Sequence, residues 1–236
     1  VRELKKIFQD KNITCYEADL RFSYRFMFDN RIRASMKIIG KARKPKEDEA
    51  LFVDNVFENP EFEPLEYWPE LDVLSFDIET TLKGDKIFAI SLYSKKIKKV
   101  LLLKEEGEYK NAEIFKTEKE MLESFKRFVL QLDPDVLTGW NVIDFDLKIL
   151  KDQFRKYNIP FILGRTDREC TLRLTDSFFT DSSANFQGRA VIDGIHLMKV
   201  SFLRLDDYKL NTAAKTILGE EKLLTSDNRG EEIEEL

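Results

Sequence analysis

The sequence predicts an α/β protein in which helices flank a mixed β-sheet. After residue 71, three apolar segments of strand length follow one another closely, as in an antiparallel meander. Helices with one apolar face then alternate with short apolar strands, which is typical of α/β proteins. With 236 residues, of which 42% are hydrophobic, the chain is long enough to bury a core.

The first 70 residues differ from the rest, because they contain too few apolar residues for a core of their own. We expect a helix, a strand, an aromatic helix and a second strand here, at residues 2–10, 13–17, 22–28 and 34–39. A charged segment and a linker punctuated by prolines follow, at residues 41–50 and 59–70. We therefore predict a partial α+β N-terminal domain with its linker over residues 1–70, and a second domain over residues 71–236.

The second domain begins with the three strands of the meander, which we place at residues 72–78, 87–93 and 99–103. Thr117 and Glu120 form a capping-box pattern at the start of the next helix. The apolar residues of that helix recur with the helical period. They are Met121, Leu122, Phe125, Phe128, Val129 and Leu132.

The remainder of this domain continues the alternation. We expect a strand, a helix, an irregular flap, a strand and a helix closed by Gly219, at residues 135–138, 144–157, 165–187, 190–193 and 209–218. Three meandering strands followed by helix, strand, helix, strand and helix fit an α/β fold of the ribonuclease H-like kind.

Composition sets broad limits on function. No apolar run reaches the roughly 18–20 residues that span a bilayer. Cys15 and Cys170 are the only cysteines, which excludes a multi-cysteine zinc site and suits a reducing compartment, so we expect a cytoplasmic protein. The net charge of −5 argues against nucleic-acid binding over the whole surface. It is compatible with an enzyme that holds cations and grips DNA in one groove.

Asp77 and Glu79 lie at the end of the first strand of the second domain. Residues two apart in a strand point to the same face, so the two carboxylates project together. Their repulsion is relieved when one takes up a proton or when a cation lies between them. Carboxylate oxygens suit Mg²⁺ or Mn²⁺. The alternative is that both carboxylates are simply solvated at a strand end.

A second acidic pattern lies at residues 138–146, where a strand passes into a helix. Asp146 falls in the first turn of the predicted helix, where the helix dipole favours an anion. The alternative is that Asp144 caps the helix, Asp146 decorates its first turn, and Trp140 and Phe145 belong to the core.

Together the two patterns resemble the first two exonuclease motifs of the family B DNA polymerases. The first is Asp77-Ile78-Glu79-Thr80. The second, about sixty residues later, is Gly139-Trp140-Asn141 with Phe145-Asp146. Residues 16–20, 133–137, 188–195 and 218–222 also resemble their counterparts in the DNA polymerase II branch. The resemblance is colinear and covers nearly the whole chain.

This resemblance implies a 3′→5′ proofreading exonuclease of the DEDD type, which hydrolyses the 3′-terminal phosphodiester of DNA with two divalent ions, Mg²⁺ or Mn²⁺. By the motifs, Asp77 would bridge the two ions, Glu79 would bind the ion that holds the attacking water, and Asp146 would hold the other ion. Asn141 and Phe145 would steady the single-stranded 3′ end. The implied partners are DNA and the remainder of a polymerase chain.

The sequence departs from the family pattern at the third motif, Tyr-x-x-x-Asp, which supplies the fourth carboxylate. The nearest match is Tyr208, which is followed four residues later by Thr212. By the resemblance, the motif belongs beyond Leu236. We therefore expect a nuclease-polymerase parent, and we expect residues 1–236 on their own to be a weak or inactive nuclease.

Two other functions stay open. One is a non-catalytic domain of the same fold that positions template DNA or a partner, although the intact set of Asp77, Glu79 and Asp146 argues against it. The other is a free-standing nuclease for RNA or repair intermediates, which needs a fourth carboxylate in its own chain. We interpret His196, the only histidine, as a surface or packing residue, and Asp193 as a cap of the following helix.

Overall fold

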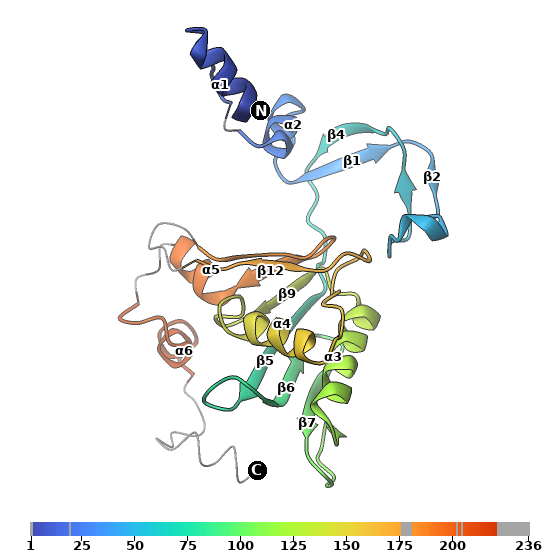
Figure 1. The fold of residues 1–236 in the computed structure, drawn as a ribbon, viewed down its shortest axis with the longest axis vertical. Coiled ribbons are helices and arrows are strands. Elements are labelled where there is room, and N and C mark those ends of the chain that lie inside the picture. Colours follow the sequence, from blue (N-terminus) through green and yellow to red (C-terminus); the bar gives the residue numbers. More distant parts are fainter. Residues whose placement is uncertain (1, 19, 176–180, 202, 204, 221–236) are drawn as a thin grey trace. The chain divides into compact units, whose positions relative to one another are not determined.

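A computed structural model describes residues 2–18, 20–175, 181–201, 203 and 205–220 (Figure 1). The chain divides into two compact units. The first consists of Val1–Glu47 and Val53–Glu70, and the second consists of Asp48–Phe52 and Leu71–Leu236. Among the described residues, no helix is long and apolar enough to cross a membrane.

The first unit contains two helices and two small antiparallel sheets. Its elements are α1 (Arg2–Asp10), α2 (Phe22–Asp29), β1 (Ser35–Ile39) paired with β4 (Glu61–Leu65), and β2 (Ala42–Arg43) paired with β3 (Val56–Phe57). The division between the units at Glu47 falls within a short 3₁₀ helix, η1 (Glu47–Glu49). Phe26 packs edge-on against Phe62, with ring centroids 5.3 Å apart. Most large apolar side chains of α1 and α2 are exposed, which agrees with the expectation of a poor core.

Two sequence predictions for this unit are wrong. No strand forms at residues 13–17, because this segment has no partner strand and Glu17 adopts a left-handed conformation with φ 53°. Conversely, β4 lies inside the segment predicted to be a linker. Its Pro64 lacks an N–H, which an edge strand tolerates because one side of the strand is unpaired.

The second unit is built on a six-stranded mixed sheet with the strand order β12-β9-β5-β6-β7-β8. The strands are β5 (Val73–Thr80), β6 (Ile87–Tyr93), β7 (Lys98–Leu103), β8 (Ala112–Phe115), β9 (Val136–Gly139) and β12 (Ala190–Asp193). Strands β5, β6 and β7 form the predicted antiparallel meander, and the other pairings are parallel. The predicted fold class, a ribonuclease H-like mixed sheet with flanking helices, is confirmed.

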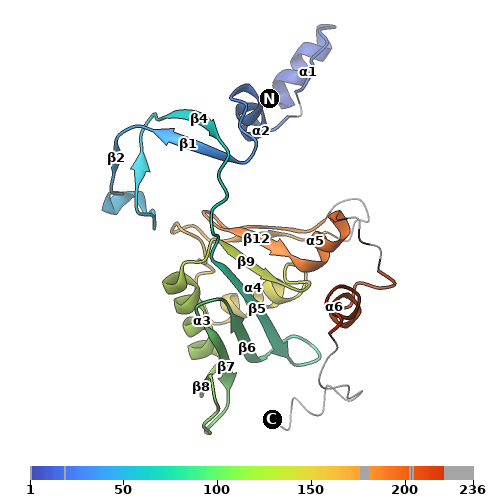
Figure 2. The same cartoon turned by 180° about the vertical axis from the view of Figure 1, so that it is seen from behind.

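Helices α3 (Glu118–Leu132) and α4 (Asp146–Lys156) cover the same face of the sheet, as Figures 1 and 2 both show. The predicted capping box is present: Glu120 N donates to Thr117 Oγ1 and Thr117 N donates to Glu120 Oε2, both at 3.2 Å. Phe125 of α3 packs against Phe76 of β5, with ring centroids 5.5 Å apart. The main core therefore lies between the sheet and these two helices.

Shorter elements complete the unit. They are β10 (Thr171–Arg173) and β11 (Ser183–Asn185), which pair antiparallel, and the helices α5 (Gly194–Val200) and α6 (Leu210–Leu218). The flap predicted at residues 165–187 thus contains an antiparallel pair of strands, and its residues 176–180 lie outside the described part. Gly219 ends α6 with φ 71°, as expected for a helix-closing glycine. Strand β8 was not placed by the sequence, and helix α5 was expected only through the cap predicted at Asp193.

Candidate active site

The first two candidate carboxylates lie on β5. The buried side chains Leu74, Phe76 and Ile78 alternate along this strand and face the core. Asp77 and Glu79 are exposed and project from the opposite face, away from α3 and α4, as the period of a strand predicts. Figure 2 shows this side of the sheet, with β5 and β6 in front of the two helices.

The third candidate carboxylate, Asp146, reaches β5 from the start of α4. Its side chain is only 1% exposed, and its Oδ1 accepts a hydrogen bond of 3.0 Å from Ile78 N. Strand β9 pairs with β5 only as far as Ser75, opposite Thr138. Beyond that point, Asp146 takes the place of a strand partner and satisfies the N–H of the residue that lies between Asp77 and Glu79.

The environment of Asp146 disfavours its ionised form. The pKa of this carboxyl is raised to about 7. Burial is the larger cause, and the negative charge of Asp77 is the second. Hydrogen bonds from backbone N–H groups, of which that of Ile78 is the larger, act in the opposite direction. The site thus contains negative charge that a proton or a cation would offset.

Gly139 allows β9 to approach β5 closely. A Cβ atom at this position would lie 2.6 Å from the carbonyl oxygen of Phe76. The chain then turns at Asn141, which is half-buried and has φ 58°, a conformation that Asn tolerates better than most residues. Phe145 N donates to Asn141 O at 3.0 Å, and Asp146 follows. The second motif therefore forms the turn that leads from β9 into α4.

The alternative interpretation of this motif is wrong in two respects. Asp144 does not cap α4, because the N-cap residue is Phe145, which makes no side-chain cap bond. The helix itself begins at Asp146, two residues after the predicted start at residue 144. Asp144 instead lies beside His196, with Oδ2 3.7 Å from Nε2, which makes an ion pair when the imidazole is protonated. Phe145 is 43% exposed and so does not belong to the core. Trp140 is half-buried, and its Nε1 donates to Tyr208 O at 3.0 Å.

Asp193 caps α5, as predicted, because its side chain accepts a hydrogen bond from Ile195 N. A second bond was not predicted: Ile143 N donates to Asp193 Oδ2 at 3.0 Å. The two residues are 50 positions apart, and neither has a local pattern that marks the contact. The only available signal was that Asp193 ends one predicted strand and Ile143 follows another, and that these two strands could lie side by side.

The donor set fits a hard divalent cation, because Asp77, Glu79 and Asp146 offer carboxylate oxygens close to one strand. Within the part of the chain that the structure describes, however, no group of three His, Cys, Asp or Glu side chains is arranged to hold a metal ion. The structure brings Asp146 against the backbone of β5 and into electrostatic contact with Asp77.

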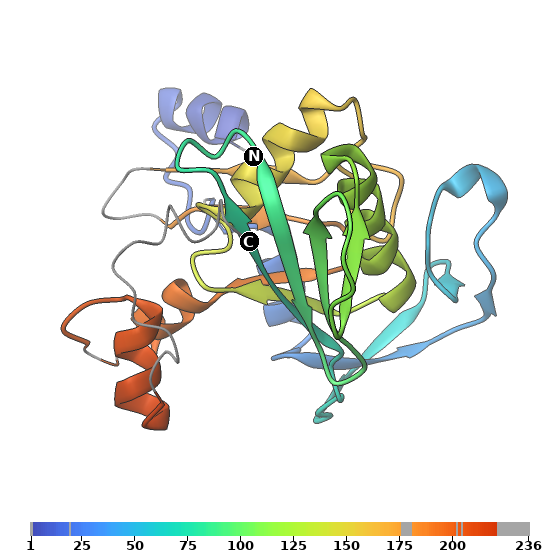
Figure 3. The same ribbon diagram turned by 90° about the horizontal axis from the view of Figure 1, so that it is seen from below.

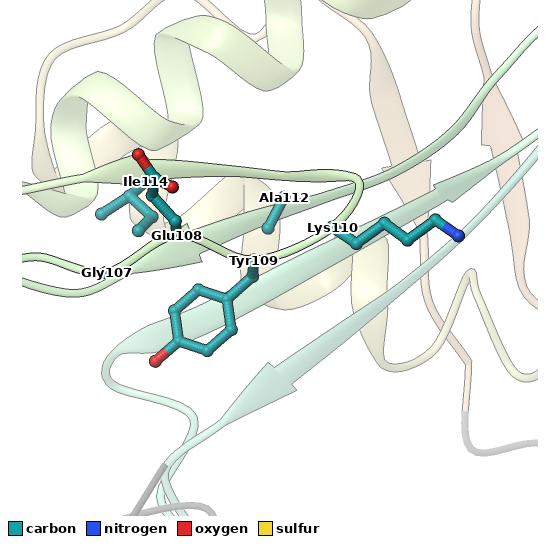
Figure 4. A pocket seen from close by; sticks show the side chains of 6 residues that line it. All are labelled: Gly107, Glu108, Tyr109, Lys110, Ala112 and Ile114. Atoms are coloured by element: carbon teal, nitrogen blue, oxygen red, sulfur yellow. The ribbon is translucent and has the colours of Figure 1, made fainter.

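A pocket lies elsewhere in this unit, at the turn between β7 and β8 (Figure 4). It is lined by Gly107, Glu108, Tyr109, Lys110, Ala112 and Ile114. Lys104 Nζ lies 5.3 Å from the ring centroid of Tyr109. None of the candidate carboxylates lines this pocket, so it is separate from the candidate active site.

Comparison with known proteins gives consistent similarities. Residues 13–213 match the family model of the DNA polymerase family B exonuclease domain. The chain is 29% identical over 242 residues to DNA polymerase II of Escherichia coli, which covers 98% of this chain and 29% of that protein. It is 32% identical over 169 residues to a DNA polymerase of Thermococcus gorgonarius, and this match covers 67% of this chain and 21% of that protein.

A solved structure shares the fold. The family B DNA polymerase of Pyrobaculum calidifontis superposes with a TM-score of 0.67 at 20% identity, over 93% of this chain and 29% of that one. The chain thus spans less than a third of the length of each of these relatives.

Proposed function

The chain belongs to the family of DNA polymerase family B exonuclease domains, and on that basis we propose that it removes nucleotides from the 3′ end of DNA by hydrolysis. The observation that carries this proposal is the contact between the two motifs, in which Asp146 accepts a hydrogen bond from Ile78 N, between Asp77 and Glu79. It joins the acidic residues of both motifs at one strand.

The metal ligands in this proposal are Asp77, Glu79 and Asp146. When bound, two divalent cations, Mg²⁺ or Mn²⁺, supply Lewis acidity for the attacking water and for the leaving 3′ oxygen. The protein contributes position: β5 fixes the exposed carboxylates, and the bond to Ile78 N fixes Asp146. The pKa of Asp146 is raised mainly by burial, and a bound cation would lower it by favouring the ionised carboxylate.

The substrate in this proposal is an unpaired 3′ terminus. Phe145 is 43% exposed beside Asp146 in sequence, and Leu82, in the turn after β5, is 97% exposed. Such apolar surfaces suit contact with unpaired bases. Asn141, at the turn before α4, would add hydrogen bonds. A duplex end would have to fray before its terminal base could reach them.

The domain's partners in this proposal are DNA and the rest of a longer polymerase. The chain spans only 29% of the length of DNA polymerase II. No Tyr-x-x-x-Asp pattern occurs in residues 1–236. We therefore propose that a fourth carboxylate comes from outside these residues, that residues 1–70 belong to a polymerase N-terminal domain, and that residues 1–236 alone are a weak nuclease.

The test uses the full-length gene product and a 5′-labelled single-stranded oligonucleotide with Mg²⁺ or Mn²⁺. We expect stepwise shortening from the 3′ end that EDTA stops and that Asp77→Ala reduces by about 100-fold or more. The matched control is Asp152→Ala, which removes an exposed carboxylate of α4 that pairs with Arg155. It should retain full activity.

Two results would contradict the proposal. One is a folded full-length protein that binds the oligonucleotide without shortening it, which would favour a non-catalytic domain that positions DNA. The other is an Asp77→Ala variant that is as active as the Asp152→Ala control.

A further inference from the structure

The end of β12 carries a buried carboxylate, Asp193, whose side chain is 2% exposed. In the parallel pairing of β12 with β9, Asp193 lies opposite Gly139, so both residues are at the carboxyl ends of their strands. After Gly139 comes the segment 140–145, which we call the motif loop and which leads into α4 at Asp146. Asp193 is therefore beside the start of the motif loop.

The two oxygens of Asp193 have different partners. Oδ1 accepts a hydrogen bond of 2.9 Å from Ile195 N and caps α5. Oδ2 accepts a hydrogen bond of 3.0 Å from Ile143 N, in the middle of the motif loop. Ile143 is itself buried, so its N–H has no easy access to water and depends on this acceptor. One carboxylate thus joins α5 to the motif loop.

The packing around Asp193 supports the same connection. A Cβ atom on Gly194 would lie 2.8 Å from Trp140 Cε3 and 3.2 Å from Gly139 O, so the start of α5 packs tightly against the motif loop. Inside the loop, the left-handed Asn141 makes a turn that the bond from Phe145 N to Asn141 O closes. The bond to Asp193 fixes the middle of that turn from outside.

We propose that Asp193 is a positioning residue, whose bond to Ile143 N holds the motif loop in the conformation that exposes Phe145 and directs Asp146 to β5. The consequence for DNA rests on the proposed function, whereas the effect on the loop does not. If Asp193 served only as a cap, Asn or Ser would replace it with little loss, because both are good N-cap residues.

The experiment compares Asp193→Asn and Asp193→Ser with the wild-type chain. Both variants keep an acceptor for the cap of α5 but lose the second acceptor for Ile143 N. Amide hydrogen exchange is measured residue by residue by NMR, and binding of a fluorescent single-stranded oligonucleotide is measured in EDTA, where metal-dependent hydrolysis stops. We expect exchange at Ile143 to accelerate about tenfold, beyond any global change. We expect binding to weaken by about threefold or more.

The matched control is Glu118→Gln. Glu118 is also a buried carboxylate, and it accepts hydrogen bonds of 2.8 Å from Ile87 N and from the hydroxyl of Tyr157. Tyr157 is the C-cap residue of α4, at the opposite end of that helix from Asp146. This variant should leave exchange at Ile143 and oligonucleotide binding unchanged.

The proposal is overturned if exchange at Ile143 is unchanged in both Asp193 variants. It is also overturned if Glu118→Gln alters exchange at Ile143 and oligonucleotide binding as much as the two Asp193 variants do. Failure of the proposed function gives a different result. In that case the full-length wild-type protein does not shorten the oligonucleotide with Mg²⁺ or Mn²⁺, whether or not it binds it, while exchange at Ile143 still reports whether Asp193 holds the loop.

Discussion

At the scale of single residues, the site is defined by how buried carboxylates are satisfied. Asp146 is almost completely buried, and its pKa is raised to about 7, because its backbone hydrogen bonds do not replace the hydration lost on burial and the negative charge of Asp77 acts in the same direction as burial. Arg189 shows the same effect for a buried cation. Burial lowers the pKa of its guanidinium, although Nη2 lies 2.9 Å from Asp133 Oδ1 and Nε donates to Leu163 O.

The raised pKa predicts how Asp146 affects stability. The folded-state pKa of about 7 lies above the ordinary value of 3.8, so the contribution of this group to stability falls as the pH rises from about 4 to about 7. In metal-free buffer, Asp146→Asn should therefore raise the unfolding temperature at pH 8 by at least about 2 °C, and by much less at pH 5. The variant amide can still accept from Ile78 N. Thermal unfolding followed by circular dichroism at both pH values measures the effect.

The exposed Asp152 provides the control, because Asp152→Asn should change stability equally at the two pH values. An Asp146→Asn effect of the same size at pH 5 and at pH 8 would show that the charge of Asp146 does not destabilise the folded protein.

At the scale of elements, the site depends on the approach of β9 to β5. Strand β9 pairs with β5 on one side and with β12 on the other, and all three run parallel. Their carboxyl ends therefore meet at one edge of the sheet, which brings together Asp77, the motif loop and Asp193. Gly139 allows this approach because its missing side chain leaves room for the carbonyl of Phe76.

Gly139→Ala should weaken both the fold and the site. The new Cβ would lie 2.6 Å from a backbone oxygen of β5, so the strands must shift, at a cost of about 1–3 kcal/mol. Gly164→Ala is a matched control, since its Cβ would lie equally close, 2.6 Å, to Gln187 O, which belongs to neither motif. Unfolding temperature and exonuclease activity are measured for both variants.

We expect similar losses of stability from the two substitutions. At a temperature where both variants are folded, only Gly139→Ala should lose most of the exonuclease activity. Equal activity of the two variants would mean that the spacing of β5 and β9 does not control the site.

At the scale of the whole molecule, the second unit includes a short segment from the N-terminal part of the sequence. Phe52 N donates to Arg165 O at 2.8 Å, and Asp167 N donates to Ala50 O at 3.2 Å. Leu51 and Thr166 form an isolated antiparallel bridge between these bonds. Arg165 also pairs with Asp133 and Asp135, which lie just before β9. The segment 48–52 is thus tied to residues that support the site.

Truncation tests this arrangement. A chain of residues 48–236 should unfold at a higher temperature than a chain of residues 53–236, because the shorter chain loses two backbone hydrogen bonds worth about 1 kcal/mol each. A chain of residues 71–236 controls for the intervening residues and should match the 53–236 chain. Identical unfolding temperatures for 48–236 and 53–236 would contradict a stabilising role of residues 48–52.

The sequence by itself determined the features that depend on neighbours along the chain. The alternation of Leu74, Phe76 and Ile78 with Asp77 and Glu79 predicted which face of β5 is buried, and the pattern Thr117-x-x-Glu120 predicted the start of α3. Both follow from local periodicity and local hydrogen bonding. The two acidic motifs, and the family to which they belong, could also be recognised from the amino-acid sequence.

Only the tertiary structure decided the contacts between distant segments. The bonds from Ile78 N to Asp146 and from Ile143 N to Asp193 join residues 68 and 50 positions apart. The failure of the strand predicted at residues 13–17, and the presence of β4 and β8, have the same origin. A short strand is stable only where a partner supplies its hydrogen bonds. The pairing of strands brings such partners together, and no local pattern specifies it.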